Sequence, residues 1–314
     1  DMADRMALGK LMIAPEEKIQ MLKISDWFAK TPHFFETNFW YMWQTTFAFQ
    51  KWSSLIEFKR YMQRMVFEFS RIQTLEGVTR TPYNQYDSII HPMKVYLEEK
   101  GVDFSLKCTV TDLEFADHDG ITVTGIQYKA AEKEGVIKLG ENDICIATNG
   151  SMTDNATLGS FKEPAPFVPE TPLSGTFWRN IAAKKQGLGN PESFFGNPAE
   201  TNWESFTVTM KGNDLLKKIE KYARNKPGSG ALMTFKESSW LMSIVVAKQP
   251  HFKNQPEDVT IFWGYGLYTD KLGDYVKKPM KDCTGEEILI ELLHHLHMEE
   301  EMDGIMGSVI NVIP

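Results

Sequence analysis

The stretch from 34 to 71 restricts the fold of this chain more than any other part, because it is unusually rich in aromatic side chains. It reads FFETNFWYMWQTTFAFQKWSSLIEFKRYMQRMVFEFSR, and its apolar side chains are material for a large buried core. Apolar residues recur at helical spacing over about 51–71, which predicts one long amphipathic helix preceded by a shorter buried one. The recurring positions are Leu55, Phe58, Met62, Met65 and Phe69.

Composition excludes several classes of protein. The chain has 314 residues, of which 42% are hydrophobic, enough for one large domain or two. Its net charge of −8 gives no basic field for phosphate backbones, so we expect no nucleic-acid partner. Cys108, Cys145 and Cys283 form no CxxC motif, which indicates a reducing, cytoplasmic compartment. No apolar run reaches the roughly 18–20 residues of a membrane span, although contact with a membrane surface stays open.

Periodicity and turn residues predict a chain of mixed α+β or α/β class. Helices are expected at about 15–29, 51–71, 84–100, 214–224 and 284–297. Strands are expected at 102–110, 121–128, 136–139, 143–147, 206–210, 231–235, 240–247 and 259–265. The first four strands suggest a βα unit with a small antiparallel excursion, and the last four suggest one mixed sheet facing an apolar cavity. Residues 162–202 are dense in proline, glycine and serine, which indicates a connection to a different part of the fold.

The string ENDICIATNGSMTDN at 141–155 predicts a short buried strand that ends in a turn at Thr148, Asn149, Gly150 and Ser151. Glycine allows close approach of a ligand, and exposed amides at such a turn can contact the ribose or phosphate of a dinucleotide. An ordinary strand-to-turn junction is the alternative. The 314 residues contain no GxGxxG opening a βαβ unit, and therefore no recognisable pyrophosphate-binding turn.

Two polar features accompany the aromatic stretch. Tyr61 could donate a proton to a substrate in an apolar tunnel, but an aromatic residue at helical spacing is usually part of the core. The string YNQYD at 83–87 could orient a bound water, or Asn84 could simply cap the following helix.

Metal and hydrolase sites find little support in the sequence. His294, His295 and His297 lack the i, i+4 spacing of a helical zinc site, so we predict surface or end-of-helix histidines and no metal. No serine lies in a GxSxG elbow, which argues against nucleophilic hydrolysis.

Long strings in a consistent order resemble the oleate hydratases, also called the myosin-cross-reactive antigen family. They are NFWYMWQTTFAFQKW (38–52), TPYNQYDSIIHPMKVYLEEKGVDF (81–104), NDICIATNGSMTD (142–154), SSWLMSIVVAKQPHFKNQP (238–256) and GDYVKKPMKDCTGEEI (273–288). The resemblance covers nearly the whole chain. It implies part of an amine-oxidase-like flavoprotein fold with mixed sheets and a long aromatic helical section. The implied division is a helical substrate-channel section (1–80), part of an FAD-binding domain (81–165) and a substrate-binding domain (166–314).

The resemblance implies an FAD-dependent lyase that adds water across the cis-9 double bond of unsaturated fatty acids such as oleic acid, giving 10-hydroxy fatty acids. The family's catalytic tyrosine matches Tyr61, and a glutamine that lines the same site matches Gln85. FAD would be approached by Val110 and by the turn Thr148, Asn149, Gly150 and Ser151. A homodimer is also implied.

The chain is expected to be an internal piece of such a protein. The family's amino-terminal dinucleotide turn, its Gly-Gly-Arg-Glu segment with the water-activating glutamate, and its carboxy-terminal section are not in the 314 residues. We therefore expect little activity from this chain alone. The alternatives are a flavin oxidoreductase of amine-oxidase-like type and a non-catalytic fatty-acid-binding antigen, because one fold can serve several functions.

Overall fold

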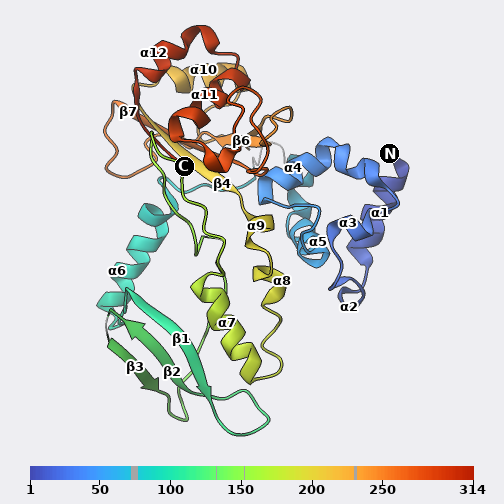
Figure 1. Cartoon of the computed structure of the whole chain (residues 1–314), viewed down its shortest axis with the longest axis vertical. Coiled ribbons are helices and arrows are strands. Elements are labelled where there is room, and N and C mark those ends of the chain that lie inside the picture. Colours follow the sequence, from blue (N-terminus) through green and yellow to red (C-terminus); the bar gives the residue numbers. More distant parts are fainter. Residues whose placement is uncertain (72–76, 132, 152, 230–231) are drawn as a thin grey trace. The chain divides into compact units, whose positions relative to one another are not determined.

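The computed structural model describes residues 1–314 except 72–76, 132, 152 and 230–231 (Figure 1). The chain divides into two compact units. Unit 1 comprises residues 1–90, 159–165 and 203–314, and unit 2 comprises 91–158 and 166–202. Each unit is described by itself below. The predicted three-part division into 1–80, 81–165 and 166–314 stays a prediction.

The amino-terminal part of unit 1 is built from short helices around a core of aromatic side chains. Trp40, Trp43 and Phe58 are fully or almost fully buried at its centre. Their rings meet edge-on or tilted, the arrangement that aromatic pairs favour. The helices are α1 (Met2–Ile13), α2 (Glu16–Ile19), α3 (Ile24–Trp27), α4 (Asn38–Phe47) and α5 (Leu55–Arg64), with 3₁₀ helices η1 (Pro32–Glu36) and η2 (Val66–Arg71).

Two predicted helices are shorter than the sequence suggested. The helix expected at 15–29 is interrupted, because backbone groups of residues 22–25 bond to residues 51–55 instead of to their own helix. Ile24 N–H donates to Ser53 O, and Leu55 N–H donates to Leu22 O. The helix expected at 51–71 exists only as α5, which is preceded by the predicted buried helix α4. Beyond it the chain continues as the 3₁₀ helix η2, in which Phe67, a residue off the predicted apolar face, is exposed.

The carboxy-terminal part of unit 1 is a five-stranded sheet of order β5-β6-β7-β4-β8 in which every pair is antiparallel. Phe206 and Phe262 point from it into the core that it shares with two helices, whereas Tyr265 belongs to a cluster with Tyr41. This alternation is the period of two expected of strands. The strands are β4 (Glu204–Lys211), β5 (Met233–Thr234), β6 (Met242–Val245), β7 (Val259–Gly266) and β8 (Val309–Ile313).

Helices α10 (Asp214–Ala223) and α11 (Gly285–His295) confirm the two helices predicted for this part of the chain. Thr284 caps α11 in a reciprocal capping box with Glu287, which fixes the start of the helix. The strand pairs of the described chain are all antiparallel, so the class is α+β and the expected mixed sheets are not found there. The remaining elements are the 3₁₀ helices η4 (Met280–Asp282) and η5 (Glu299–Glu301) and the short helix α12 (Met302–Met306).

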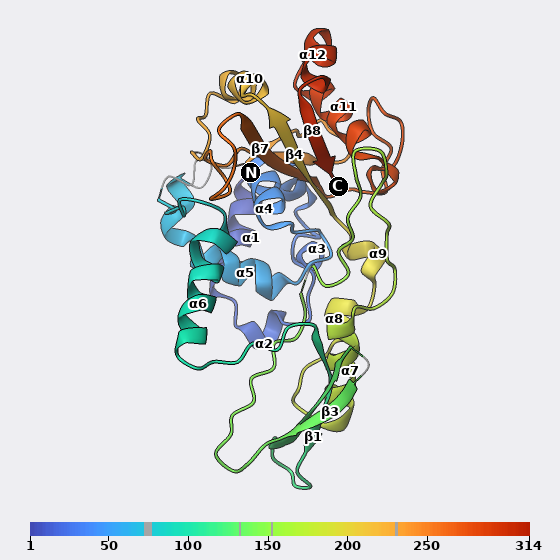
Figure 2. The ribbon, with the colours of Figure 1, turned by 90° about the vertical axis from the view of Figure 1, so that its left-hand side faces the viewer.

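Unit 2 contains a three-stranded antiparallel sheet, β1-β2-β3, which confirms the antiparallel excursion (Figure 2). β1 begins at Cys108 and not at 102, so the first predicted strand started too early. Leu113 of β1 packs with Phe177 and Ile181 of α7, which the sequence did not predict. The elements are β1 (Cys108–Phe115), β2 (Val123–Ala130), β3 (Lys133–Lys138), α6 (His91–Glu99), α7 (Leu173–Lys184), α8 (Glu192–Phe195) and α9 (Pro198–Thr201).

The helix predicted at 84–100 is a π-helical turn, Tyr86–Ile90, followed by α6. Pro92 has no N–H to donate to the preceding turn, which accounts for the local departure from α-helical bonding. Gly101 ends the helix with a φ of +83°, as predicted.

The segment at 143–147 is not a strand, contrary to the sequence prediction. It is extended but pairs with no strand in the part of the chain that the structure describes. Ile144 and Ile146 are consequently 87% and 85% exposed.

Across the described ranges, no helix combines the length and apolar content that crossing a bilayer requires.

Candidate functional site

Unit 2 contains a pocket of about 360 Å³ beside the turn that the sequence singled out. Val110 of β1 and Thr148, two of the predicted flavin contacts, line it together. Its size lies within the range typical of small-molecule sites, and it could hold part of a dinucleotide. The other lining residues are Thr109, Leu113, Ile126, Cys145, Ile146, Ala147, Asp154, Leu173, Ser174 and Phe177.

Two polar atoms in this region are buried without a hydrogen-bond partner in the described chain. They are the side-chain oxygens Asn149 Oδ1 and Ser174 Oγ. Ser174 is held at the pocket because its backbone N–H donates to Asp154 Oδ2 at 2.9 Å. A buried polar atom without a partner costs about 1–3 kcal/mol, so both atoms suit a ligand that supplies the missing hydrogen bonds.

The turn at Gly150 needs a residue without a side chain. Its φ of +84° lies in the left-handed region, and an added Cβ would lie 3.3 Å from Phe195 Cζ. Ser151, the last predicted flavin contact, is exposed, and its Oγ accepts the Thr153 backbone N–H at 3.2 Å and lies 3.0 Å from Thr153 Oγ1. Hydroxyl groups, an unpaired amide oxygen and a glycine turn are compatible with the ribose and ring edges of a flavin nucleotide.

Tyr61 lies in unit 1 on α5, at the rim of the aromatic core. Its ring meets Phe47 and Phe49 edge-on, with centroids 4.9 and 5.4 Å away, and the residue is 37% exposed. The ring is therefore packed on one side and accessible on another, unlike the fully buried Phe58 of the same helix. Such a position leaves the phenol able to meet a substrate.

Polar contacts fix α5 to the preceding helices. Lys59 is buried and donates from Nζ to Ala14 O at 2.6 Å. Arg60 binds both carboxylate oxygens of Glu16, at 2.9 and 2.6 Å, which lowers the pKa of that carboxyl group. These contacts restrict movement of the helix that carries Tyr61.

Gln85 lies in a segment that is anchored to a distant loop of unit 1. Asn84 donates from its backbone N–H and from Nδ2 to His251 O, at 2.8 and 3.2 Å, and Lys253 N–H donates to Asp87 Oδ2. Asn84 Oδ1 accepts the N–H of Asp87, which confirms the predicted capping role. Gln85 itself is exposed, and no hydrogen bond joins it to Tyr61 in the described part of the chain.

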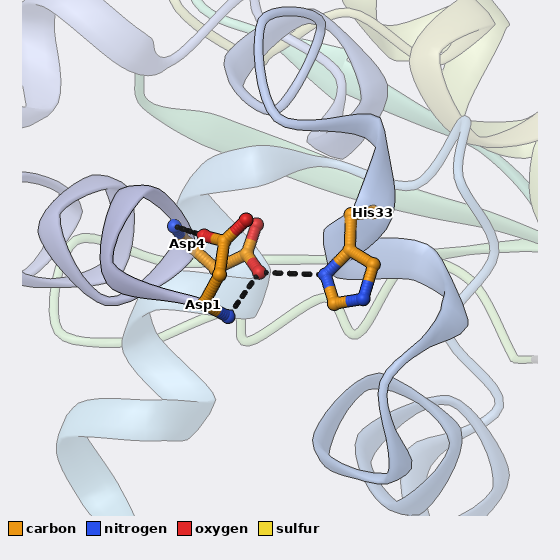
Figure 3. A group of neighbouring side chains, drawn as sticks. All are labelled: Asp1, Asp4 and His33. Atoms are coloured by element: carbon orange, nitrogen blue, oxygen red, sulfur yellow. Dashed lines mark hydrogen bonds and ion pairs between the residues drawn. The ribbon is translucent and has the colours of Figure 1, made fainter.

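Two groups of carboxylate and histidine side chains were missed by sequence reasoning. One lies at the start of α1, where Asp4 Oδ2 accepts from the Asp1 amino group at 2.8 Å and lies 3.0 Å from His33 Nδ1 (Figure 3). Burial alone would raise the pKa of Asp4, but the hydrogen bonds from the amino group and His33 outweigh it and lower that pKa. The other group is Asp274, Glu291 and His295.

Ser174 was also missed, and no local signal could have found it. It lies 20 residues after Asp154 in a stretch whose prolines and glycines predicted only a connection. The Glu291–His295 pair did carry a signal, because residues at i and i+4 share one face of a helix. His295 is the last residue of α11, as predicted, but its side chain is only 9% exposed and does not lie at the surface.

Comparisons with known proteins agree on one family. The model of the MCRA family matches residues 1–314. The chain is 38% identical over 336 residues to a linoleate hydratase of Lactiplantibacillus plantarum, covering 99% of this chain and 59% of that protein. It is 35% identical over 315 residues to an oleate hydratase of Streptococcus pyogenes serotype M49 (strain NZ131), covering 97% of this chain and 53% of that protein. The chain thus spans a little over half the length of these relatives.

Proposed function

Because this chain belongs to the MCRA family, we propose that it carries part of an FAD-dependent fatty acid hydratase. The substrate would be an unsaturated fatty acid such as oleic acid, and water would add across its cis-9 double bond to give a 10-hydroxy acid. The observation that carries this proposal is the match to a linoleate hydratase and an oleate hydratase over 99% and 97% of the chain.

Tyr61 is the proposed acid. An alkene is a poor base, so hydration needs a proton donor held over one carbon and an activated water over the other. The phenol O–H would give its proton to one alkene carbon while the water oxygen bonds to the other carbon. The proton lost by the water would pass to the glutamate of the expected Gly-Gly-Arg-Glu segment, and the tyrosine would regain its proton in a later step.

The aromatic surroundings support this role for Tyr61. Phe47 and Phe49 lie against its ring and offer an apolar surface on which an alkyl chain can lie. A water-poor wall also strengthens any charge interaction beside it. Gln85 is proposed to orient the substrate or the water, since its segment is anchored through Asn84 and Asp87.

The pocket of unit 2 is the proposed flavin contact. Val110, Thr148, Asn149, Gly150 and Ser151 would hold FAD, with the unpaired Asn149 Oδ1 accepting a hydrogen bond from it. Hydration involves no net electron transfer. Bound FAD would therefore contribute a planar ring with polar edges to the site, and not a redox step. The amine-oxidase-like flavoprotein fold, the homodimer and a cytoplasmic location with peripheral membrane contact belong to the same proposal.

Product mass tests the reaction. A protein of the relatives' full length that contains this chain should convert oleic acid into an acid heavier by one water when FAD is present. Tyr61→Phe should lower turnover by about 10²–10⁴-fold, the usual contribution of a general acid, and leave FAD content unchanged. The matched control is Tyr222→Phe, another partly exposed tyrosine of unit 1, which should keep normal turnover.

Other products identify the alternatives. A product that has lost two hydrogens would indicate a flavin oxidoreductase, and tight fatty acid binding without flavin or product would indicate a binding antigen. Normal hydration by Tyr61→Phe would refute the acid assignment alone. The 314-residue chain by itself is expected to show little activity, and turnover near that of the longer protein would refute that expectation.

A further inference from the structure

The carboxylate and histidine group at the end of α11 shares no residue with the sites proposed above. Glu291 and His295 lie one turn apart on the helix, and Asp274 belongs to the loop before it. His295 Nε2 is 3.4 Å from Asp274 Oδ2 and 3.4 Å from Glu291 Oε1. Glu291 is fully buried, and the His295 side chain is 9% exposed.

Hydrogen bonds hold both carboxylates in place but leave each with acceptor capacity toward the histidine. Glu291 accepts the backbone N–H groups of residues 274, 275 and 276, at 2.6, 3.0 and 2.8 Å. Only the first of these reaches Oε1, the oxygen nearest His295. Asp274 Oδ1 accepts a hydrogen bond from the Ser239 hydroxyl, and Asp274 Oδ2 accepts one from the Ser239 backbone N–H. Since a carboxylate has about four acceptor positions, one remains on each facing oxygen.

His295 Nε2 has no hydrogen-bond partner in the described chain. One possible ligand atom each from Asp274, Glu291 and His295 therefore lies within 4.8 Å of the other two, and of these side chains only Asp274 is substantially exposed, at 33%. A cation among the three atoms would offset the negative charges of the two carboxylates. The site also lies at the carboxyl end of α11, where the helix dipole favours a cation.

We propose that Asp274, Glu291 and His295 bind a divalent transition-metal ion of the Zn²⁺ type. Ligand atoms about 2.1 Å from a tetrahedral metal lie about 3.4 Å apart, which matches both separations at His295 Nε2. One imidazole nitrogen with two carboxylate oxygens suits Zn²⁺ or Mn²⁺ better than Ca²⁺ or Mg²⁺, which prefer oxygen ligands throughout. The backbone N–H groups on Glu291 and the Ser239 contacts on Asp274 are the outer support such a site needs.

The ion would attach the loop at residues 273–276 to the end of α11. Tyr275 extends this contact by stacking on His294, with ring centroids 4.3 Å apart. The proposal does not depend on the proposed hydratase activity. The group at Asp1, Asp4 and His33 (Figure 3) carries no such proposal, because the His33 side chain is exposed.

Zinc titration of the purified protein, freed of metal with a chelator, tests this site. Calorimetry and elemental analysis should find one Zn²⁺ per chain, measured in a His33→Ala background that removes the other histidine group. His295→Ala and Asp274→Asn should each weaken Zn²⁺ binding at least tenfold. His294→Ala, at the neighbouring position, is the matched control and should bind Zn²⁺ like the wild type.

Circular dichroism should verify that each variant is folded. If His295→Ala does not fold, the Zn²⁺ affinity of Asp274→Asn tests the proposal. Zn²⁺ should also raise the melting temperature of the unsubstituted protein, a readout that needs no variant. Equal Zn²⁺ affinity in the wild type and Asp274→Asn would overturn the proposal. The absence of any Zn²⁺ uptake by the unsubstituted protein would also overturn it.

Discussion

Glu204 should make this protein less stable as the pH rises through the neutral range. The residue opens β4, is only 8% exposed, and neither carboxylate oxygen has a hydrogen-bond partner in the described chain. Burial, with a smaller contribution from the negative charge of Asp282, raises the pKa of Glu204 from 4.5 to about 8. The folded protein therefore retains a proton on Glu204 that the unfolded chain loses near pH 4.5.

The sign and size of the effect follow from this difference. Because the pKa of Glu204 is higher in the folded state, its contribution to stability is full below about pH 4.5 and is lost as pH rises to about 8. Each pH unit between these values costs about 1.4 kcal/mol of unfolding free energy. Between pH 5.5 and 8 the loss approaches about 3 kcal/mol, an upper value because buried sites relax around a charge.

Glu204→Gln isolates this contribution because glutamine has the same shape and does not ionise. Urea unfolding at a series of pH values should show the variant gaining on the wild type as pH rises from 5.5 to 8, with a constant difference above about 8.5. Glu257→Gln is the matched control, an exposed glutamate whose substitution should leave the pH profile unchanged. Parallel profiles for the wild type and Glu204→Gln would refute the reasoning.

Three further predictions concern the core, the cap and the flavin pocket. Trp43→Ala should lower the unfolding free energy by about 3–5 kcal/mol in urea titrations, because its ring is fully buried, and a loss below about 1 kcal/mol would contradict the aromatic core. Asn84→Ala removes the side-chain hydrogen bond to the Asp87 N–H and should lower the unfolding free energy in urea by about 1 kcal/mol, whereas an unchanged urea midpoint would refute the capping role. Gly150→Ala should reduce the FAD content measured by absorbance, unlike Gly101→Ala, which has a similar positive φ but nothing within 4 Å; equal FAD contents would place the flavin elsewhere.

Sequence periodicity predicted the elements whose burial repeats regularly. α10 and α11 have apolar residues on one face and a clear start, so their limits were found within one or two residues. The helix expected at 51–71 ended early because the backbone changes to the 3₁₀ helix η2 at Val66, which the regular spacing of the apolar residues does not reveal. The segment at 143–147 has the composition of a strand, but a strand forms only where a neighbour supplies hydrogen bonds.

The candidate site was predictable in part. Val110 and Thr148 were named from the resemblance, and the structure places them in one pocket. Ser174 and Asp154 complete that pocket through a contact across 20 residues, which sequence spacing cannot show. Asp274 and His295 likewise meet through the fold of a loop onto the end of a helix. The roles of Tyr61 and Gln85 stay predictions.

Hydration of oleic acid in H₂¹⁸O is the most direct test of the proposed function. A protein of the relatives' full length that contains this chain, supplied with FAD, should yield 10-hydroxystearic acid with one ¹⁸O at carbon 10. Tyr61→Phe should retain its flavin and form almost none of this product. Unlabelled, dehydrogenated product, or unchanged oleic acid with flavin bound, would contradict the account.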